Sequence, residues 1–239
     1  MPEMPDVIVL CGGAGIRLRS VVGAAPKGMA VVAGRPFLEV LLRQLSRCHF
    51  ERAILAVGYQ RETIQSYFGE TAFGMRLLYS VETSALGTAG ALRNAAPLVA
   101  SKTVLAMNGD SYTDLDLGKL AGEDRDPPAD AGLVLVPADG RSDCGFVAVK
   151  PNGEVALFDE KNSSCRASYV NAGIYKFKVE MLYEIPAGRE VSLEKEMLPR
   201  WLNEGKHIRG FVHAGQCLDI GTPERYQVAQ TALAGVEAR

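Results

Sequence analysis

The sequence predicts an α/β fold in which a Rossmann-like, doubly wound, mostly parallel (mixed) sheet carries a small antiparallel β subdomain. An apolar run over residues 7–10 leads directly into a glycine-rich loop, as a buried strand of a parallel sheet does at a ligand-binding turn. Strand and helix patterns then alternate to about residue 120, and shorter strand patterns follow. This alternation is typical of a parallel sheet covered by helices on both faces.

The elements of the first half follow from apolar spacing. Continuous apolar runs predict strands at 7–10, 52–57, 75–79 and 103–107, with a short extended piece at 29–32. Apolar faces at helical spacing predict helices at 36–48, 61–68 and 87–99. Pro36 suits the first turn of the first of these helices, because the amide N–H that proline lacks has no helical partner there.

A polar stretch over 121–128 marks the border of the second half. Strands are expected beyond it at 132–136, 145–149, 155–158, 169–177, 208–213 and 217–220, and short helices after Lys178 and Ser192. Thr222 is a good N-cap for a last helix to about 234, with Pro223 in its first turn. With no linker between the parts, we expect a single domain over 1–239, with halves at about 6–120 and 130–221 and a C-terminal helix at 222–235.

Composition limits the class of protein. The chain has 239 residues, of which 47% are hydrophobic and 23% charged, the balance of an ordinary globular protein. Its net charge of -2 argues against a nucleic-acid partner, and no apolar run approaches the ~18 residues that span a membrane. The five cysteines form no C-x-x-C pair and the N-terminus lacks signal-peptide features, so a cytoplasmic protein with reduced thiols is expected.

The glycine loop predicts a phosphate-binding site. Gly12, Gly13 and Gly15 follow the first strand, where backbone N–H groups approach an anion closely because no Cβ intervenes. Arg17 and Lys27 add positive charge. The spacing fits neither a Walker loop nor the dinucleotide fingerprint, because Leu18 stands where the fingerprint has its third glycine. An NAD-dependent dehydrogenase is therefore disfavoured, although a loop of this kind taken alone is also compatible with a simple tight turn.

Two carboxylates are placed to meet such a phosphate. Asp110 and Asp219 each follow an apolar strand, and ligands of open α/β sheets bind at the carboxyl ends of strands. Mg²⁺ is usually held by one or two carboxylates together with phosphate oxygens, so the pair predicts a Mg²⁺ site. Taken singly, Asp110 is equally well explained as a turn residue and Asp219 as a residue that leads into the last helix.

In their order along the chain, these motifs resemble those of the sugar-1-phosphate nucleotidyltransferases, over residues 6 to about 234. The matching segments are Gly12-Gly13-Ala14-Gly15-Ile16-Arg17-Leu18 with Lys27, Leu86-Gly87-Thr88-Ala89-Gly90-Ala91, Asn108-Gly109-Asp110, Asp159-Glu160-Lys161, Asn171-Ala172-Gly173-Ile174-Tyr175 and Asp219-Ile220-Gly221-Thr222-Pro223-Glu224. Three positions depart from the family pattern: Gly28 replaces a proline, Cys11 replaces an alanine, and 141–145 replaces the usual approach to the sugar strand.

The resemblance implies a role for each match. The first half would bind the nucleotide, and the second half would bind the sugar and supply the second metal carboxylate. The nucleotide-binding residues would be Leu10, Gly12, Gly13, Gly15, Arg17, Glu82, Leu86, Gly87, Thr88, Asn108 and Gly109. The sugar-binding residues would be Gly145, Glu160, Lys161, Asn171 and Gly173. Arg17, Lys27, Asp110 and Asp219 would be catalytic, with Asp110 and Asp219 as ligands of Mg²⁺.

The implied reaction is an in-line attack by an oxygen of a sugar 1-phosphate on the α-phosphorus of a nucleoside triphosphate, which expels pyrophosphate. Neither the nucleophile nor the leaving group needs a proton to be shuttled, so the protein positions the reactants and neutralises charge. Ordinary surface or core roles are therefore expected for His49, His207 and His213.

The resemblance also indicates which nucleotide base and which sugar the protein would bind. Guanine presents N1–H and N2–H₂ donors, which the carboxylate of Glu82 would accept, whereas a glutamine would suit a pyrimidine better. Length and local motifs look most like the D-glycero-α-D-manno-heptose-1-phosphate guanylyltransferases, which would give GTP and a sugar 1-phosphate as partners in surface-polysaccharide synthesis. Mannose-1-phosphate guanylyltransferases, N-acetylmuramate-1-phosphate uridylyltransferases and a catalytically silent nucleotide sensor are the alternatives. The family also allows a homodimer.

Overall fold

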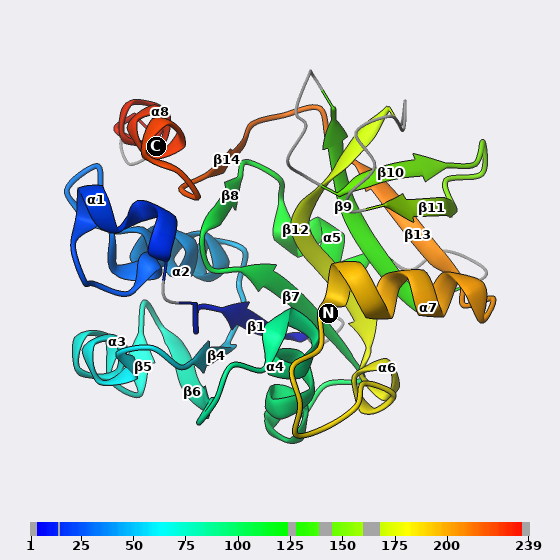
Figure 1. Cartoon of the computed structure of the whole chain (residues 1–239), viewed down its shortest axis with the longest axis horizontal. Coiled ribbons are helices and arrows are strands. Elements are labelled where there is room, and N and C mark those ends of the chain that lie inside the picture. The colour runs from blue at the N-terminus through cyan, green and yellow to red at the C-terminus, as the bar shows by residue number, and fades with distance from the viewer. Residues whose placement is uncertain (1–3, 14, 124–127, 139–144, 160–167, 236–239) are drawn as a thin grey trace.

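The structure is a computed structural model of the chain, and it describes residues 4–13, 15–123, 128–138, 145–159 and 168–235. Within these residues a ten-stranded sheet forms the centre of the molecule (Figure 1). Strands follow one another across it in the order β11-β10-β12-β7-β1-β4-β6-β5, while β9 pairs with β12, and β13 with β9. The four strands β7, β1, β4 and β6 are parallel neighbours, so the predicted α/β fold with a mixed sheet is confirmed.

The strands have these bounds: β1 Asp6–Leu10, β2 Val31–Val32, β3 Arg35–Pro36, β4 Arg52–Val57, β5 Thr71–Ala72, β6 Met75–Val81, β7 Thr103–Asn108, β8 Ser111–Thr113, β9 Ala131–Pro137, β10 Phe146–Val149, β11 Val155–Asp159, β12 Tyr169–Lys178, β13 Ile208–Val212 and β14 Cys217–Asp219. The helices are α1 Arg19–Val22, α2 Phe37–Arg47, α3 Arg61–Phe68, α4 Gly87–Ala95, α5 Leu117–Gly122, α6 Val179–Tyr183, α7 Leu198–Asn203 and α8 Pro223–Leu233. Shorter 3₁₀ turns are η1 Ile16–Leu18, η2 Lys27–Met29 and η3 Ala96–Leu98, and η4 Leu193–Met197 is a π-helical turn.

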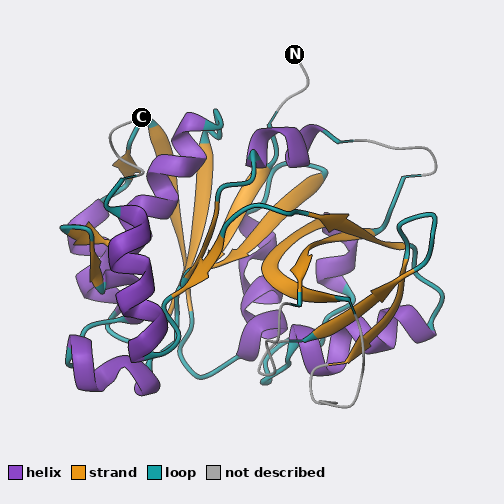
Figure 2. Cartoon of the chain, turned by 90° about the horizontal axis from the view of Figure 1, so that it is seen from above, coloured by secondary structure: helices purple, strands orange, loops and turns teal. Residues whose placement is uncertain are grey.

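Helices cover both faces of the sheet (Figure 2). Side chains alternate along a strand, so in β1 Val7 and Val9 belong to one buried cluster and Ile8 to the other. The first cluster contains the apolar faces of α2, α3 and α8, and the second those of α4, α6 and α7. Each face of the parallel strands is thus buried under helices, which explains their continuous apolar sequences.

The strand β12 joins the parallel sheet to the smaller β region. Its end from Ile174 pairs antiparallel with β7, and its beginning pairs antiparallel with β10, while β9 runs along its other edge. The register shifts between Asn171 and Tyr175, where Gly173 has φ 74°. The smaller region is largely antiparallel, as predicted, but β13 runs parallel to β9.

Several expected elements differ at their ends. Pro36 has an extended ψ of 137° and lies in β3, so α2 begins at Phe37 rather than at the proline. The helix expected over 87–99 ends at Ala95 and continues as the 3₁₀ turn η3, in which Pro97 has no N–H to donate. The strand β8 and the helices α1 and α5 were not predicted. Within the described residues, no helix is long and apolar enough to cross a membrane.

The last helix starts as predicted. Thr222 is the N-cap of α8, accepting from the backbone N–H of Arg225 at 3.4 Å, and Pro223 occupies the first turn. Figure 1 shows α8 near the N-terminal helices α1 and α2. Gln230 of α8 donates to the carbonyl of Val31 at 2.6 Å, and this contact holds the C-terminal helix beside the first fifth of the chain.

Candidate active site

A cavity of about 660 Å³ lies at the carboxyl ends of the parallel strands. Its wall includes Leu10 at the end of β1, Gly58 after β4, Glu82 after β6 and Asn108 at the end of β7. The predicted residues that line it are Leu10, Gly12, Gly13, Lys27, Glu82, Leu86, Gly87, Thr88, Asn108, Gly109 and Asp110. A cleft at this edge is where open α/β sheets bind ligands.

The glycine loop closes tightly over its neighbours. A Cβ on Gly12 would lie 2.7 Å from Oε1 of Glu82, and one on Gly15, which has φ 57°, would lie 2.9 Å from Cβ of Lys27. The carbonyl of Gly12 accepts the backbone N–H of Tyr59 at 3.2 Å. Among the described residues, no atom lies within 4 Å of a Cβ built on Gly13. A side chain would therefore have space at Gly13, whereas a Cβ at Gly12 or Gly15 would contact a neighbouring side chain.

Lys27 and Asp110 meet at the floor of the cavity. The Lys27 ammonium donates to the Asp110 carboxylate, and the two side chains are 15% and 30% exposed. Gly109 makes this approach possible, because its N–H donates to the carbonyl of Leu10 at 2.8 Å and a Cβ there would lie 2.7 Å from that same oxygen. The end of β7 is thereby fixed against the end of β1.

The second carboxylate is brought to the same place by β14. Residues 217–219 pair antiparallel with β8, and the N–H of Ile220 donates to the carbonyl of Asp110 at 3.0 Å. Oδ1 of Asp219 accepts the N–H of Gly221 at 2.8 Å, and Oδ2 lies 3.1 Å from Nη1 of Arg225. The backbones that carry the two predicted metal carboxylates are therefore hydrogen-bonded neighbours.

The four predicted catalytic side chains converge around Gly221. A Cβ on that residue would lie 2.8 Å from Oδ1 of Asp219, 3.6 Å from Nζ of Lys27 and 3.8 Å from Nη2 of Arg17, while Lys27 pairs with Asp110. Arg17, Asp219 and Gly15 do not line the cavity itself. They surround its edge, on the side of the glycine loop.

The donor set fits Mg²⁺. Among the described residues, no group of three or more His, Cys, Asp and Glu side chains forms a complete metal cage. Asp110 and Asp219 offer hard carboxylate oxygens from adjacent backbones, and Mg²⁺ typically takes one or two carboxylates together with substrate phosphate oxygens and water. Such a site is completed by its substrate, so an incomplete protein cage is what this chemistry requires.

The loop at the entrance of α4 shapes the opposite wall. Gly87 has φ 69°, and a Cβ there would lie 2.5 Å from the carbonyl oxygen of Val191. The N–H of Val191 donates to the carbonyl of Leu86 at 2.8 Å. The Thr88 hydroxyl donates to Oε2 of Glu194 at 2.7 Å and accepts the N–H of Leu193 at 2.8 Å. This wall thus depends on a segment about a hundred residues further along the chain.

The side chain of Glu82 is partly buried. Burial raises the pKa of its carboxyl group above the usual range, and a hydrogen bond from the backbone N–H of Leu86 opposes that rise. Burial and the nearby charge of Glu82 together raise the pKa of the Cys11 thiol, which donates to the carbonyl of Ala56 at 3.2 Å. Cys11 is therefore a buried and protonated part of the cavity wall, as its small size suggests.

The predicted sugar residues lie partly beside this cavity. A Cβ on Gly173 would lie 2.4 Å from Nδ2 of Asn108, so β12 crosses directly against the nucleotide-side asparagine. The N–H of Asn171 donates to the carbonyl of Gly145 at 3.0 Å, and its side-chain oxygen accepts the N–H of Gly173 at 3.1 Å. Glu160 and Lys161 lie outside the described residues, as does 141–144 of the departing loop.

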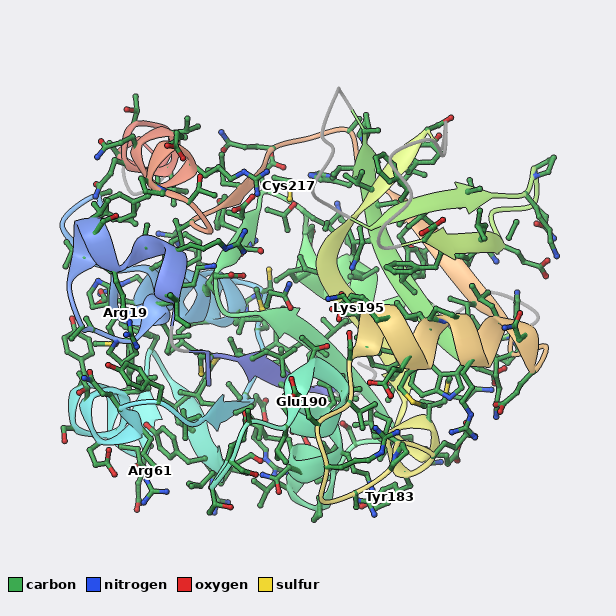
Figure 3. All side chains as sticks on the ribbon, viewed as in Figure 1. Arg19, Arg61, Tyr183, Glu190, Lys195 and Cys217 are labelled. Carbon is green, nitrogen blue, oxygen red and sulfur yellow. The ribbon has the colours of Figure 1, made fainter. Side chains whose placement is uncertain are left out.

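Several residues of the site were not predicted. Gly58, Tyr59 and Glu190 line the cavity, and Glu190 is labelled in Figure 3. The Arg19 guanidinium lies 5.4 Å from the centroid of the Tyr59 ring. Of these residues, Gly58 could have been predicted from the sequence, because it ends the second predicted strand at the same edge as the glycine loop. Arg225 carries no such signal, because only the folded chain brings its side chain onto Asp219.

Two proteins named as guanylyltransferases are similar to most of this chain. The mannose-1-phosphate guanylyltransferase of Mycobacterium tuberculosis is 36% identical over 223 residues, which are 92% of this chain but only 62% of that protein. A D-glycero-alpha-D-manno-heptose 1-phosphate guanylyltransferase of Aneurinibacillus thermoaerophilus is 34% identical over 233 residues, which are 95% of this chain and 98% of that protein. This chain therefore spans under two thirds of the first relative and nearly all of the second.

The solved structures agree with the sequence relatives. The crystal structure of HddC from Yersinia pseudotuberculosis superposes with a TM-score of 0.83 at 28% identity, covering 96% of this chain and all of that one. The same protein complexed with GMP-PN gives a TM-score of 0.82 at 29% identity. The family model described as "Nucleotidyl transferase" matches residues 6–235. With its glycine loop, both carboxylates and this match over nearly the whole chain, the protein belongs to the nucleotidyl transferase family, as the motifs predicted.

Proposed function

We propose that the protein transfers a guanylyl group from GTP to D-glycero-α-D-manno-heptose 1-phosphate, giving GDP-heptose and pyrophosphate. The observation that carries the guanylyl half is Glu82, an acidic hydrogen-bond acceptor on the cavity wall between the glycine loop and α4. The guanylyltransferase names of the relatives and the GMP-PN complex of HddC support the same base.

The sugar assignment rests on how much of each relative this chain covers. A heptose 1-phosphate guanylyltransferase is matched over 98% of its length, and a second one, from Campylobacter jejuni, is 31% identical over 96% of its length. Mannose 1-phosphate is the second candidate substrate, because the mannose-1-phosphate relative is the more identical of the two at 36%.

The positive charges of Lys27 and Arg17 support an in-line displacement at the α-phosphorus. An oxygen of the sugar 1-phosphate forms the new bond to phosphorus, while the oxygen that bridges the α- and β-phosphates leaves with pyrophosphate. In the proposal, Lys27 and Arg17 neutralise the phosphates from one side, and N–H groups of Gly12, Gly13 and Gly15 bind the triphosphate. Bound Mg²⁺, held by Asp110 and Asp219, would supply further neutralisation of charge.

The sugar would lie toward β12. Gly173 lies against Asn108, Asn171 bonds to Gly173, and Gly145 is hydrogen-bonded to Asn171, so we propose that these three residues form one side of the sugar site next to the cavity. Glu160 and Lys161 are proposed to complete it. Orientation of the attacking phosphate against the α-phosphate is the main catalytic contribution of such an arrangement.

Pyrophosphate release tests the proposal. The purified protein with Mg²⁺ is assayed with each of four nucleoside triphosphates against heptose, mannose, glucose and N-acetylmuramate 1-phosphates. A maximum with GTP and the heptose phosphate is the expected result. A maximum with mannose 1-phosphate would move the enzyme to the second candidate, a maximum with UTP would remove Glu82 as the base reader, and no release with any pair would indicate a nucleotide sensor.

A further inference from the structure

The carboxylate of Glu194 connects the two sides of the proposed active site. Its Oε2 accepts the hydroxyl of Thr88, on the nucleotide side, at 2.7 Å. Its Oε1 accepts the hydroxyl of Tyr175, on the sugar side, at 3.1 Å. Thr88 and Tyr175 come from different elements, α4 and β12, and both of their hydroxyls donate to this one side chain.

On the sugar side, the hydrogen bonds continue to Asn171, a predicted sugar-binding residue. Tyr175 is fully buried in β12, and its hydroxyl accepts from Nδ2 of Asn171 at 2.6 Å. Oδ1 of Asn171 in turn accepts the N–H of Gly173 at 3.1 Å, within the segment where the register of β12 shifts. A continuous series of hydrogen bonds therefore runs from Gly173 through Asn171, Tyr175 and Glu194 to Thr88.

The chemistry of this series requires a carboxylate. Three hydroxyls donate to Glu194, those of Thr88 and Ser192 to Oε2 and that of Tyr175 to Oε1, and an ionised carboxylate accepts at both oxygens. A glutamine amide offers an acceptor on one side only and places an N–H₂ group on the other. Replacing Glu194 by Gln thus breaks the contact on one side while nearly preserving the shape of the side chain.

The helical turn that carries Glu194 is itself unusual. Ser192 is its N-cap and accepts the N–H of Lys195 at 3.1 Å, and the N–H of Met197 reaches back five residues to the carbonyl of Ser192. The wide turn precedes Pro199, which has no N–H to continue the regular ladder. π-Helical turns of this kind occur frequently at functional sites.

We propose that Glu194 is a positioning residue that couples the nucleotide-side loop 86–88 to the sugar-side segment 171–173. The proposal rests on the function proposed above, because it takes Thr88 and Asn171 as parts of the two substrate sites. Tyr175 does not line the cavity, so an effect of its hydroxyl on nucleotide binding would be indirect, and the hydrogen-bond series offers a route for it. Energetic coupling between contacting residues is measured by a double-mutant cycle.

The test uses GTP binding by calorimetry, which needs no turnover. We expect Tyr175→Phe and Glu194→Gln each to weaken GTP binding about 3- to 10-fold, which lies in the lower part of the coupling range for contacting residues. In the Glu194→Gln background, Tyr175→Phe should add almost nothing. Glu196→Gln is the matched control, because Glu196 lies in the same turn and its carboxylate bonds, within the part of the chain that the structure describes, to Ser192 and Arg189; its GTP affinity should stay within about twofold of wild type.

Kinetics separate positioning from a merely structural role. Glu194→Gln is expected to raise the KM for the sugar phosphate and for GTP together, with thermal stability close to that of Glu196→Gln. Additive effects of Tyr175→Phe and Glu194→Gln, or equal effects of the two glutamine variants, would overturn the coupling. If Tyr175→Phe does not fold, Asn171→Ala replaces it in the cycle, because the Asn171 side chain donates to the Tyr175 hydroxyl on the sugar side of the series. Wild-type protein that binds no GTP would instead refute the proposed function.

Discussion

Lys27 and Asp110 form an ion pair although 83 residues separate them in the chain. The lysine follows the glycine loop and the aspartate follows β7, so the pair connects the two segments that would hold the triphosphate and the metal. The side chain of Lys27 is largely shielded from solvent, and its ammonium is held at the cavity before any substrate arrives. A charge fixed in advance costs little reorganisation during the reaction.

Lys27→Met should therefore reduce kcat/KM by about 10²- to 10³-fold, by analogy with the loss of one preorganised donor. The fold should persist, because Asp110 remains partly exposed and is not left uncompensated in a dry interior. Pyrophosphate release and circular dichroism measure the two effects. Lys119→Met, at a side chain that is 87% exposed, is the control and should retain full activity. Wild-type turnover by Lys27→Met would remove the lysine from the mechanism.

Local patterns in the sequence were sufficient for the parallel sheet and for placing the glycine loop and Asp110 at one edge of it, whereas most of the other predicted site residues came from the resemblance to the family. The strands that precede Gly12 and Asp110 are short, continuous apolar runs, and each is followed by a residue type that suits phosphate or metal chemistry. The strand β8 has only three residues, and it is stabilised by pairing with β14 about a hundred residues away, which no local pattern reveals. Glu194 was not predicted for the same reason, since its partner Thr88 is 106 residues away in the chain. Arg225 lies only six residues from Asp219, but the turn that brings the two side chains together has no signal in the sequence.

Glu82→Gln should lower the preference for GTP over UTP. An amide donates as well as accepts, so it cannot receive both guanine donors as a carboxylate does. Because hydrogen bonds to charged groups contribute about 1.5–3 kcal/mol, the ratio of kcat/KM values for GTP and UTP should fall roughly 10- to 100-fold. The measurement is steady-state kinetics with each nucleotide. An unchanged ratio would show that Glu82 does not read the base.

The same substitution predicts a pH dependence of stability. Burial raises the pKa of the Glu82 carboxyl above its ordinary value of 4.5. A raised pKa means that the folded state holds the proton more tightly, so the stabilisation is present below pH 4.5 and is lost as the pH rises through the folded-state pKa. Glu82→Gln stays neutral, so its Tm relative to that of wild type should increase as the pH rises above 4.5 through the folded-state pKa of Glu82. A difference in Tm that does not change with pH would contradict this.

Cys11 should resist alkylation although it lines the cavity. Its side chain is 5% exposed, and burial raises the pKa of the thiol, so very little thiolate is present at pH 8. Iodoacetamide followed by peptide mapping should therefore modify Cys11 more slowly than the free amino acid, because the thiolate is the reactive form. Cys48 and Cys217, which are partly exposed, serve as internal comparisons. Equal rates at all three would contradict the buried, protonated state.

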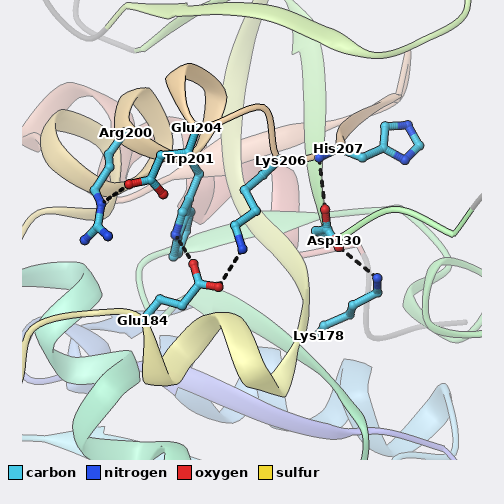
Figure 4. A network of polar contacts seen from close by, with 8 residues as sticks. All are labelled: Asp130, Lys178, Glu184, Arg200, Trp201, Glu204, Lys206 and His207. Carbon is cyan, nitrogen blue, oxygen red and sulfur yellow. Dashed lines mark hydrogen bonds and ion pairs between the residues drawn. The ribbon is translucent and has the colours of Figure 1, made fainter.

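Glu184 should matter for stability through a contact away from the cavity (Figure 4). Its Oε2 accepts the indole N–H of the fully buried Trp201 at 3.0 Å, and its Oε1 accepts from Lys206 at 2.6 Å. Glu184→Ala leaves the indole donor buried without this acceptor, and an unsatisfied buried donor costs about 1–3 kcal/mol. The free energy of unfolding, measured with urea, should fall by that amount.

Two further variants decide whether the indole contact is the cause. Glu184→Gln keeps an amide oxygen that can accept from Trp201, so it should lose less stability than Glu184→Ala. Glu204→Ala breaks only the ion pair with Arg200, whose Nε lies 2.7 Å from the carboxylate on the exposed side of the same helical region (Figure 4). Exposed pairs contribute about 0–1 kcal/mol, so Glu204→Ala should cost the least. If Glu204→Ala and Glu184→Ala cost the same, the buried indole N–H does not depend on Glu184, and the stability of this region comes from the packing of Trp201 alone.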